Sequence, residues 1–171
     1  VIEMADTAAL QENKRHGDRW FPFDIYPCTI PKDFPQVALH WQNSMELIFV
    51  KKGSGLVQVG LEPVTARAGD IFVLAPGMLH GLGQLPGETM EYENIIFEVE
   101  LLGGSSDLCY RRYLLPLQSG RLPLPSRLTP GRPCYDGALG CLRQLENVNR
   151  DRVLGYELHV KGLLLSLLSL L

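Results

Sequence analysis

Two stretches of strand-like residues, separated and bounded by turns, constrain the fold of this chain most. The first is HWQNSMELIFVKKG, from His40 to Gly53, and the second is GDIFVLAPGMLH, from Gly69 to His80. His40 and Gln42 are two residues apart, so their side chains would share one face of a strand. Short apolar runs between turn residues are typical of the strands of a small β-barrel.

Further strand patterns surround these two stretches. An alternating aromatic run, Trp20 to Tyr26, predicts a first strand that is edge-like because it contains proline. The residues Lys51 to Gly55 (KKGSG) predict a hairpin turn between two strands. About eight short strands with turn signals between them precede any convincing helix, which indicates a barrel or jelly roll. We expect the other strands near residues 37–42, 47–50, 56–59, 62–67, 71–75 and 91–99.

The pattern changes to a helical one after Gly103-Gly104. Ser105 to Asp107 offers helix caps for a short helix over 108–115, and a proline-rich stiff loop follows over 118–133. Apolar residues spaced three apart then predict a helix that begins near Tyr135, and a second helix runs from about Leu154 to the end. Two such helices joined by a short turn form an antiparallel hairpin.

The last helix is unusually rich in leucine. Small residues form a stripe along one side of it, at Gly155, Gly162, Ser166 and Ser169. A helix that is apolar all round is buried all round, and one small barrel cannot surround it. We therefore interpret it as a dimerisation helix; the alternative is a helix clamped between the barrel and its partner helix. Its leucines are Leu158, Leu163, Leu164, Leu165, Leu167, Leu168, Leu170 and Leu171.

Composition excludes several functional classes. The 171 residues, 46% hydrophobic and 20% charged, indicate one soluble globular domain. A net charge of -3 gives no basic footprint for nucleic acid. The apolar tail over 163–171 is shorter than the roughly 20 residues that span a bilayer. The cysteines lack metal-site spacing and no signal peptide is evident, so we expect reduced thiols in a cytoplasmic protein. They are Cys28, Cys109, Cys134 and Cys141.

The order His-x-Gln-x-x-x-Glu-(six residues)-Gly, followed by Gly-Asp-strand-Pro-Gly-x-x-His, resembles the two sequence motifs of the cupin superfamily. In that superfamily two His and one Glu of the first motif, with the His of the second, converge on a metal inside a barrel. The resemblance thus implies His40, Glu46 and His80 as ligands. Two positions depart from the pattern: Gln42 stands where the metal-binding motif has His, and Phe34 replaces its opening Gly.

With the leucine-rich helices included, the chain resembles the N-terminal effector-binding and dimerisation domain of AraC/XylS-type transcriptional regulators. The implied fold is mainly β: a cupin, jelly-roll-like β-barrel followed by a C-terminal antiparallel α-helical hairpin. The first 18 residues would be a disordered lead or an arm that packs on the barrel, 19–104 the barrel, and 105–171 the helical region. The helix-turn-helix pair of such regulators is absent from this chain, so we expect DNA contact only through a domain outside it. The matching segments are 21–26, 40–55, 68–81, 92–102 and 155–171.

The resemblance implies a sensor that is not an enzyme, with a small-molecule effector inside the barrel and a homodimer formed by the last helix. Polar inward side chains favour a sugar-like effector. Aromatic residues would add a stacking wall, and an arginine would anchor an anionic group. The candidate ligand-binding residues are His40, Gln42, Glu46, His80, Trp20, Tyr26, Arg67 and Phe97. His16 lies in the polar lead, and we expect it at the solvent or an interface.

Three interpretations of His40, Glu46 and His80 remain open. They would bind a divalent metal (zinc, nickel or iron), with the Gln42 amide oxygen completing the set. They would instead contact the effector directly, or form a polar cluster that only stabilises the barrel. A metal-loaded barrel raises an alternative function, a metal-dependent cupin enzyme of the dioxygenase or sugar isomerase/epimerase type. The helical region and the Gln at position 42 count against that alternative.

Overall fold

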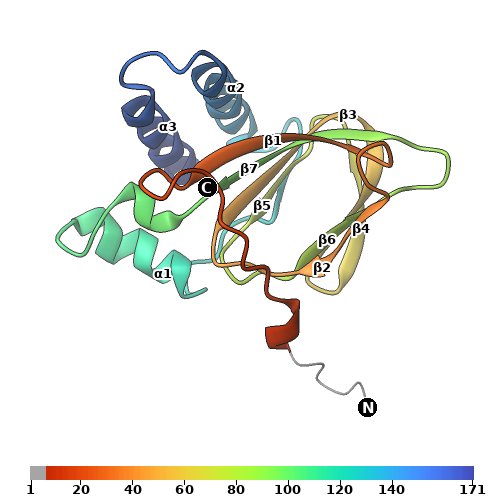
Figure 1. Ribbon diagram of the computed structural model, residues 1–171, viewed down its shortest axis with the longest axis horizontal. Coiled ribbons are helices and arrows are strands. Elements are labelled where there is room, and N and C mark those ends of the chain that lie inside the picture. The colour runs from red at the N-terminus through yellow and green to blue at the C-terminus, as the bar shows by residue number, and fades with distance from the viewer. Residues whose placement is uncertain (1–6) are drawn as a thin grey trace.

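In the computed structural model, which describes residues 7–171, an antiparallel sheet bends into two halves that face each other, with helices packed outside one half (Figure 1). One half has the strand order β1-β7-β3-β5-β8, and in the other half β2 pairs with β6, and β3 pairs with β6 and β4. The strands are β1 Phe23–Ile30, β2 Gln36–His40, β3 Met45–Val59, β4 Glu62–Arg67, β5 Ile71–Leu74, β6 His80–Gly83, β7 Met90–Phe97 and β8 Arg127–Leu128.

Strand β3 joins the two halves, and it corrects the predicted hairpin turn at 51–55. The chain does not reverse there: β3 is one continuous strand of 15 residues. Its first part pairs with β5 and β7, and its second part with β4 and β6. A bulge between Val50 and Lys52 and a positive φ of 73° at Gly53 bend the strand. A Cβ at Gly53 would lie 1.8 Å from the Thr89 carbonyl oxygen, so the bend requires glycine.

Both faces of the β1-β7-β3-β5 half are buried, so alternate residues enter two separate apolar clusters. Ile48 and Val50 belong to the cluster between the two halves of the sheet. Leu47 and Phe49 belong to the cluster between the sheet and the helices. Ile95, Phe97 and Val99 all lie in the sheet–helix cluster, and the strand expected over 91–99 ends at Phe97.

The helical region follows the sheet. The expected helix at 108–115 is a continuous helical segment that includes a π-helix and α1. The proline-rich loop is held to the barrel because Arg127 in β8 donates to Asp70 Oδ2 at 2.5 Å and to the Thr65 carbonyl at 3.0 Å. The helices are η1 Thr7–Leu10, η2 Val99–Leu102, η3 Tyr110–Leu114, α1 Leu115–Gln118, α2 Tyr135–Asp151 and α3 Tyr156–Leu170.

Helices α2 and α3 pack against each other and against the sheet (Figure 1). One face of α3, represented by Leu164 and Leu167, is buried. On its other face Leu158 is 77% and Leu165 38% exposed, so one protomer does not cover the helix all round. No helix within the described residues is long and apolar enough to cross a membrane.

The N-terminal arm contacts the barrel from Leu10 onward; the first six residues of the predicted arm lie outside the described residues. Gln11 forms a parallel bridge with Trp41, just beyond β2. The Glu12 N–H donates to the Trp41 carbonyl at 2.8 Å, and the Trp41 N–H donates to the Leu10 carbonyl at 3.0 Å. These bonds fix the position of the residues that follow in the arm.

Candidate functional site

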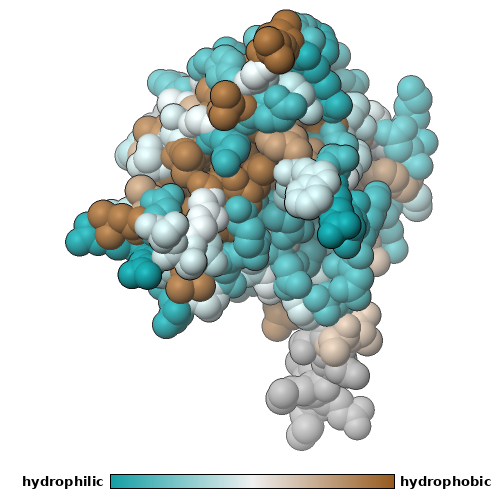
Figure 2. Space-filling view, turned by 60° about the vertical axis from the view of Figure 1, so that its left-hand side comes forward, coloured by the Kyte–Doolittle hydropathy of each residue, from teal (hydrophilic) through white to brown (hydrophobic). Residues whose placement is uncertain are grey.

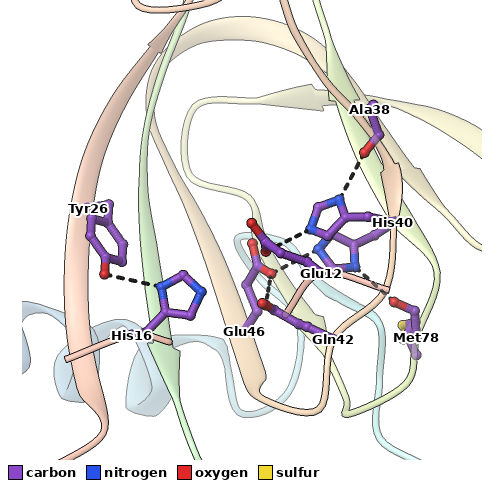
Figure 3. A network of polar contacts seen from close by, with 9 residues as sticks. Glu12, His16, Tyr26, Ala38, His40, Gln42, Glu46 and Met78 are labelled. Carbon is purple, nitrogen blue, oxygen red and sulfur yellow. Dashed lines mark hydrogen bonds and ion pairs between the residues drawn. The ribbon is translucent and has the colours of Figure 1, made fainter. Parts of the chain in front are cut away.

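The motif residues His40, Gln42, Glu46 and His80 meet at one end of the barrel (Figure 3). His40 ends β2, Glu46 lies at the start of β3, and His80 begins β6. Because His40 is the register partner of His80, their rings lie side by side, with centroids 4.3 Å apart and planes tilted by 57°. The spacing of the motif residues along the strands thus brings their polar side chains together in one compact group.

Glu46 is the centre of this group. Its Oε2 accepts a hydrogen bond from Gln42 Nε2 at 2.5 Å and lies 2.9 Å from His80 Nε2. All three residues are buried. Burial by itself disfavours the charged imidazole, but the contact with Glu46 and the bond to the Met78 carbonyl outweigh it, so the pKa of His80 is raised.

Backbone carbonyls orient both imidazoles. His40 Nδ1 is 2.9 Å from the Ala38 carbonyl, and His80 Nδ1 is 2.8 Å from the Met78 carbonyl. A carbonyl oxygen only accepts, so each Nδ1 must carry the hydrogen and each Nε2 is left for another bond. His80 Nε2 and the Glu46 carboxylate would repel each other as two lone pairs, so the contact requires a cation between them, either a proton or a metal.

The donor set fits a divalent metal. One ligand atom from each of His40, Glu46 and His80 lies within 4.8 Å of the others. Gln42 Oε1 is buried and has no hydrogen-bond partner among the described residues, but it is the amide nitrogen of Gln42 that faces Glu46. Imidazole nitrogens held by carbonyls through Nδ1, with a carboxylate, are a donor set for zinc or another transition metal.

A cavity of about 430 Å³ extends from this group along the barrel interior. Its walls come from β1, β2, β7, the loop between β1 and β2, and the arm. The residues that line it are Glu12, Lys14, His16, Tyr26, Pro27, Cys28, Asp33, Phe34, Val37, His40, Glu46, Leu82, Tyr92, Asn94 and Ile96.

His16 is the main residue that sequence reasoning missed. It is not at the solvent: the residue is only 5% exposed, and its Nδ1 lies 3.1 Å from the Tyr26 hydroxyl (Figure 3). Burial lowers the pKa of His16. Glu12, Lys14 and His16 all line the cavity and are spaced by two, so an alternation in the arm was the available signal. Glu12 Oε2 is 3.5 Å from His40 Nε2, which connects the arm with the motif residues.

The remaining predicted residues divide into one that reaches the cavity and three that do not. Tyr26 lines it. Trp20 precedes β1, is 82% exposed and packs its ring against Arg19. Arg67 is an exposed residue at the end of β4. Phe97 is buried in the sheet–helix cluster, because alternation along β7 directs Asn94 and Ile96, not Phe97, toward the cavity.

Comparison with solved structures gives cupin proteins of low sequence identity. The plu4264 protein from Photorhabdus luminescens is 18% identical, with 46% of this chain and 65% of that chain covered and a TM-score of 0.40. A Cupin 2 conserved barrel domain protein from Salinispora arenicola CNS-205 is 16% identical, with coverages of 59% and 73% and a TM-score of 0.40. The Cnp3 cupin domain from Schizosaccharomyces pombe is 10% identical, with coverages of 53% and 70% and a TM-score of 0.42. A comparison with curated proteins gives no match.

The model of one protein family matches residues 25–168, which include every strand from β2 to β8, the whole of α2 and nearly all of α3. That family is described as the AraC-like ligand binding domain. It matches the barrel together with the helices that follow. The chain therefore belongs to the family of AraC-like ligand binding domains.

Proposed function

We propose that this chain is the effector-sensing and dimerisation part of an AraC-type transcription regulator that acts in the cytoplasm. The observation that carries the proposal is the cavity of about 430 Å³ inside the barrel, with charged and hydroxyl groups on its walls. This volume lies within the range of roughly 300–1,000 Å³ that small-molecule sites have. DNA would be contacted by a helix-turn-helix domain outside this chain.

The effector is a small, hydroxylated, sugar-like molecule. Tyr26, His40 and Asn94 offer hydrogen-bonding groups on different walls of the cavity, and Tyr92 offers an aromatic ring. A hydroxyl group both donates and accepts, so one molecule with several hydroxyls would match such mixed walls. Tyr26 and His40 retain the ligand-binding role predicted for them.

The helices α2 and α3 form an antiparallel hairpin that would hold two copies together. Leu158 and Leu165 are exposed on α3, and Gly162, Ser166 and Ser169 are exposed on the same side. Apolar side chains gather on the face of the molecule that carries the helices (Figure 2). A second copy would cover this face and let two helices approach closely at the small residues. Light scattering of the Leu158→Glu/Leu165→Glu variant tests this, and a wild-type monomer at all concentrations would refute it.

Calorimetric titration tests effector binding. A panel of monosaccharides and sugar alcohols is compared with a panel of aromatic acids. We expect saturable binding of a hydroxylated compound and its loss in Tyr26→Leu and His40→Leu. Arg67→Gln, which changes an exposed side chain away from the cavity, serves as the control and keeps binding. Tight binding of an aromatic acid with no binding of any sugar would contradict the sugar-like assignment.

The convergence of His40, Glu46 and His80 within 4.8 Å supports a second candidate, a metal-dependent cupin enzyme. A divalent cation bound there would supply Lewis-acid chemistry; His40, Glu46 and His80 would hold it, and Gln42 would orient Glu46 through its hydrogen bond. Elemental analysis of protein purified without a nickel column decides this point. Stoichiometric metal that is lost in His80→Ala supports the candidate, and a substoichiometric content in the wild type contradicts it.

A further inference from the structure

The charged groups around the cavity are not balanced. Three carboxylates, from Glu12, Asp33 and Glu46, and one ammonium, from Lys14, lie among the lining residues. Three carboxylates and one ammonium leave an excess of negative charge among these lining residues. Glu46 is buried, whereas Asp33 and Lys14 are exposed, so solvent screens part of this excess. A net negative lining attracts a monovalent cation and disfavours an anion.

The aromatic wall of the same cavity suits a cation. Tyr26 and Tyr92 line it, and their ring faces carry the negative end of the aromatic quadrupole. The ammonium of Lys14 already lies 5.4 Å from the centroid of the Tyr26 ring. The Tyr26 ring thus already contacts a cation that belongs to the protein.

Two buried acceptors at the cavity wall have no donor. His16 Nε2 and Asn94 Oδ1 lack hydrogen-bond partners among the described residues. His16 Nδ1 lies 3.1 Å from the Tyr26 hydroxyl, and in the tautomer in which Nδ1–H donates to the Tyr26 oxygen, Nε2 carries no hydrogen. The lone pair of the neutral His16 imidazole is then on Nε2, turned toward the barrel interior (Figure 3). Both atoms would be satisfied by a ligand that donates hydrogen bonds.

We propose that the effector carries a protonated amino group beside its hydroxyl groups, and that this group donates to His16 Nε2 and Asn94 Oδ1 at the arm side of the cavity. An ammonium has three donors and no acceptor, and it supplies the missing positive charge. The proposal rests on the proposed effector-binding function and narrows the effector class. It concerns the metal-free site, since a divalent cation at His40, Glu46 and His80 would itself remove the negative excess.

A matched series of ligands tests the amino group. The three probes are glucamine, D-glucitol and D-gluconate, which share one polyol chain and differ in charge at one end. Calorimetric titrations are run at pH 7.5 with a chelator present. We expect glucamine to bind at least about tenfold more tightly than D-glucitol, because charge-assisted hydrogen bonds are about twice as strong as neutral ones. D-Gluconate is expected to bind most weakly.

The outcomes separate this proposal from the proposed function. Equal or tighter binding of D-glucitol or D-gluconate overturns the amino group and leaves the effector cavity intact. Binding of a neutral sugar from the monosaccharide panel without binding of glucamine has the same meaning. No binding by any of these compounds or by the aromatic acids overturns both.

Variants locate the group within the cavity. Asn94→Leu removes one acceptor and is expected to lower the ratio of glucamine to D-glucitol affinity about tenfold. Asn94→Asp keeps an acceptor and adds a charge, so the ratio should rise. Asp33→Asn, at an exposed position where misfolding is not expected, should lower the ratio about threefold. Arg67→Gln is the control, and ratios that stay unchanged in all three cavity variants overturn the proposal.

Discussion

Two glutamates, the buried Glu46 inside the barrel and the half-buried Glu93 beneath helix α2, are compensated in opposite ways. Glu46 accepts from Gln42 and contacts His80. Glu93 instead meets the carboxylate of Glu146 from α2, and Lys51 pairs with both of them. Burial and the contact with Glu146 raise the pKa of Glu93 to about 7. Burial alone would raise the pKa of Glu146, but the hydrogen bonds with Glu93 and Lys51 outweigh it, so the pKa of Glu146 is lowered.

This difference indicates which part of the molecule has a stability that depends on pH. In the barrel, the donors around Glu46 fit its ionised form, so the group suits charge recognition. At the joint between sheet and helix, two carboxylates share one ammonium, so Glu93 holds a proton at low pH that it loses near neutrality. Arg143 on α2 is the other cation that acts on Glu146. The joint is therefore a part of the molecule whose stability follows pH.

The largest effect should come from removing the barrel glutamate. Glu46→Leu leaves Gln42 and His80 buried without their acceptor, and breaking such a pair costs about 3 kcal/mol or more. Urea unfolding of Glu46→Leu beside Glu46→Gln, which keeps the shape, measures this free energy. A loss below about 1 kcal/mol for Glu46→Leu would show that these contacts contribute little to stability.

Removal of the carboxylate of Glu93, at the joint between sheet and helix, should stabilise the protein instead. Glu93 has a folded pKa of about 7, above its ordinary 4.5, so its ionisation destabilises the fold as pH rises from about 5 to above 7. Glu93→Gln removes this loss, and the variant should be more stable than wild type by about 1–2 kcal/mol at pH 8 and equal to it at pH 5. Thermal and urea unfolding across this range provide the measurement. A pH-independent difference would contradict the shared proton.

Removal of the shared ammonium comes next in size. In Lys51→Met the carboxylates of Glu93 and Glu146 lose the cation between them. The side chain of Lys51 is 33% exposed, so solvent screens the pair and we expect a loss of about 1 kcal/mol at pH 8. The loss should shrink at pH 5, where Glu93 is protonated. An equal loss at both pH values would indicate that only the packing of the lysine stem matters.

The adjacent lysine provides the matched control and the smallest effect. Lys52 pairs with Glu91 at 3.5 Å, but its side chain is 75% exposed. Exposed pairs of this kind contribute about 0–1 kcal/mol. Lys52→Met should change the free energy of unfolding by less than about 0.5 kcal/mol at either pH. A change as large as that of Lys51→Met would mean that total surface charge, and not the contacts of Lys51 with Glu93 and Glu146, sets how the free energy of unfolding changes with pH.

The sequence was sufficient for the parts of the site fixed by local spacing. His40, Gln42, Glu46 and His80 come together because each is placed at a strand end or in the adjoining turn. The face of β7 was not predictable in the same way. Alternation separates Phe97 from Asn94 but does not say which face is inside, because helices bury one face and the barrel interior the other.

Two further errors have physical causes. The residues KKGSG predicted a reversal, yet glycine at 53 serves a bend in one continuous strand, and the same residue type suits both. His16 was predicted at the solvent or an interface, and its burial depends on the arm lying along Trp41, a residue far along the chain. The alternation in the arm indicates that one face is covered, but it does not show which part of the chain covers it.

The continuity of β3 has a mechanical consequence. Glu46 at the motif site and Lys51 at the helix joint lie on one uninterrupted strand, five residues or about 17 Å apart along it. No loop between them can absorb a displacement. The motif site at Glu46 and the place where α2 is fastened at Lys51 are therefore connected by one short piece of strand, and the bulge at Lys51 is the nearest point at which this strand bends.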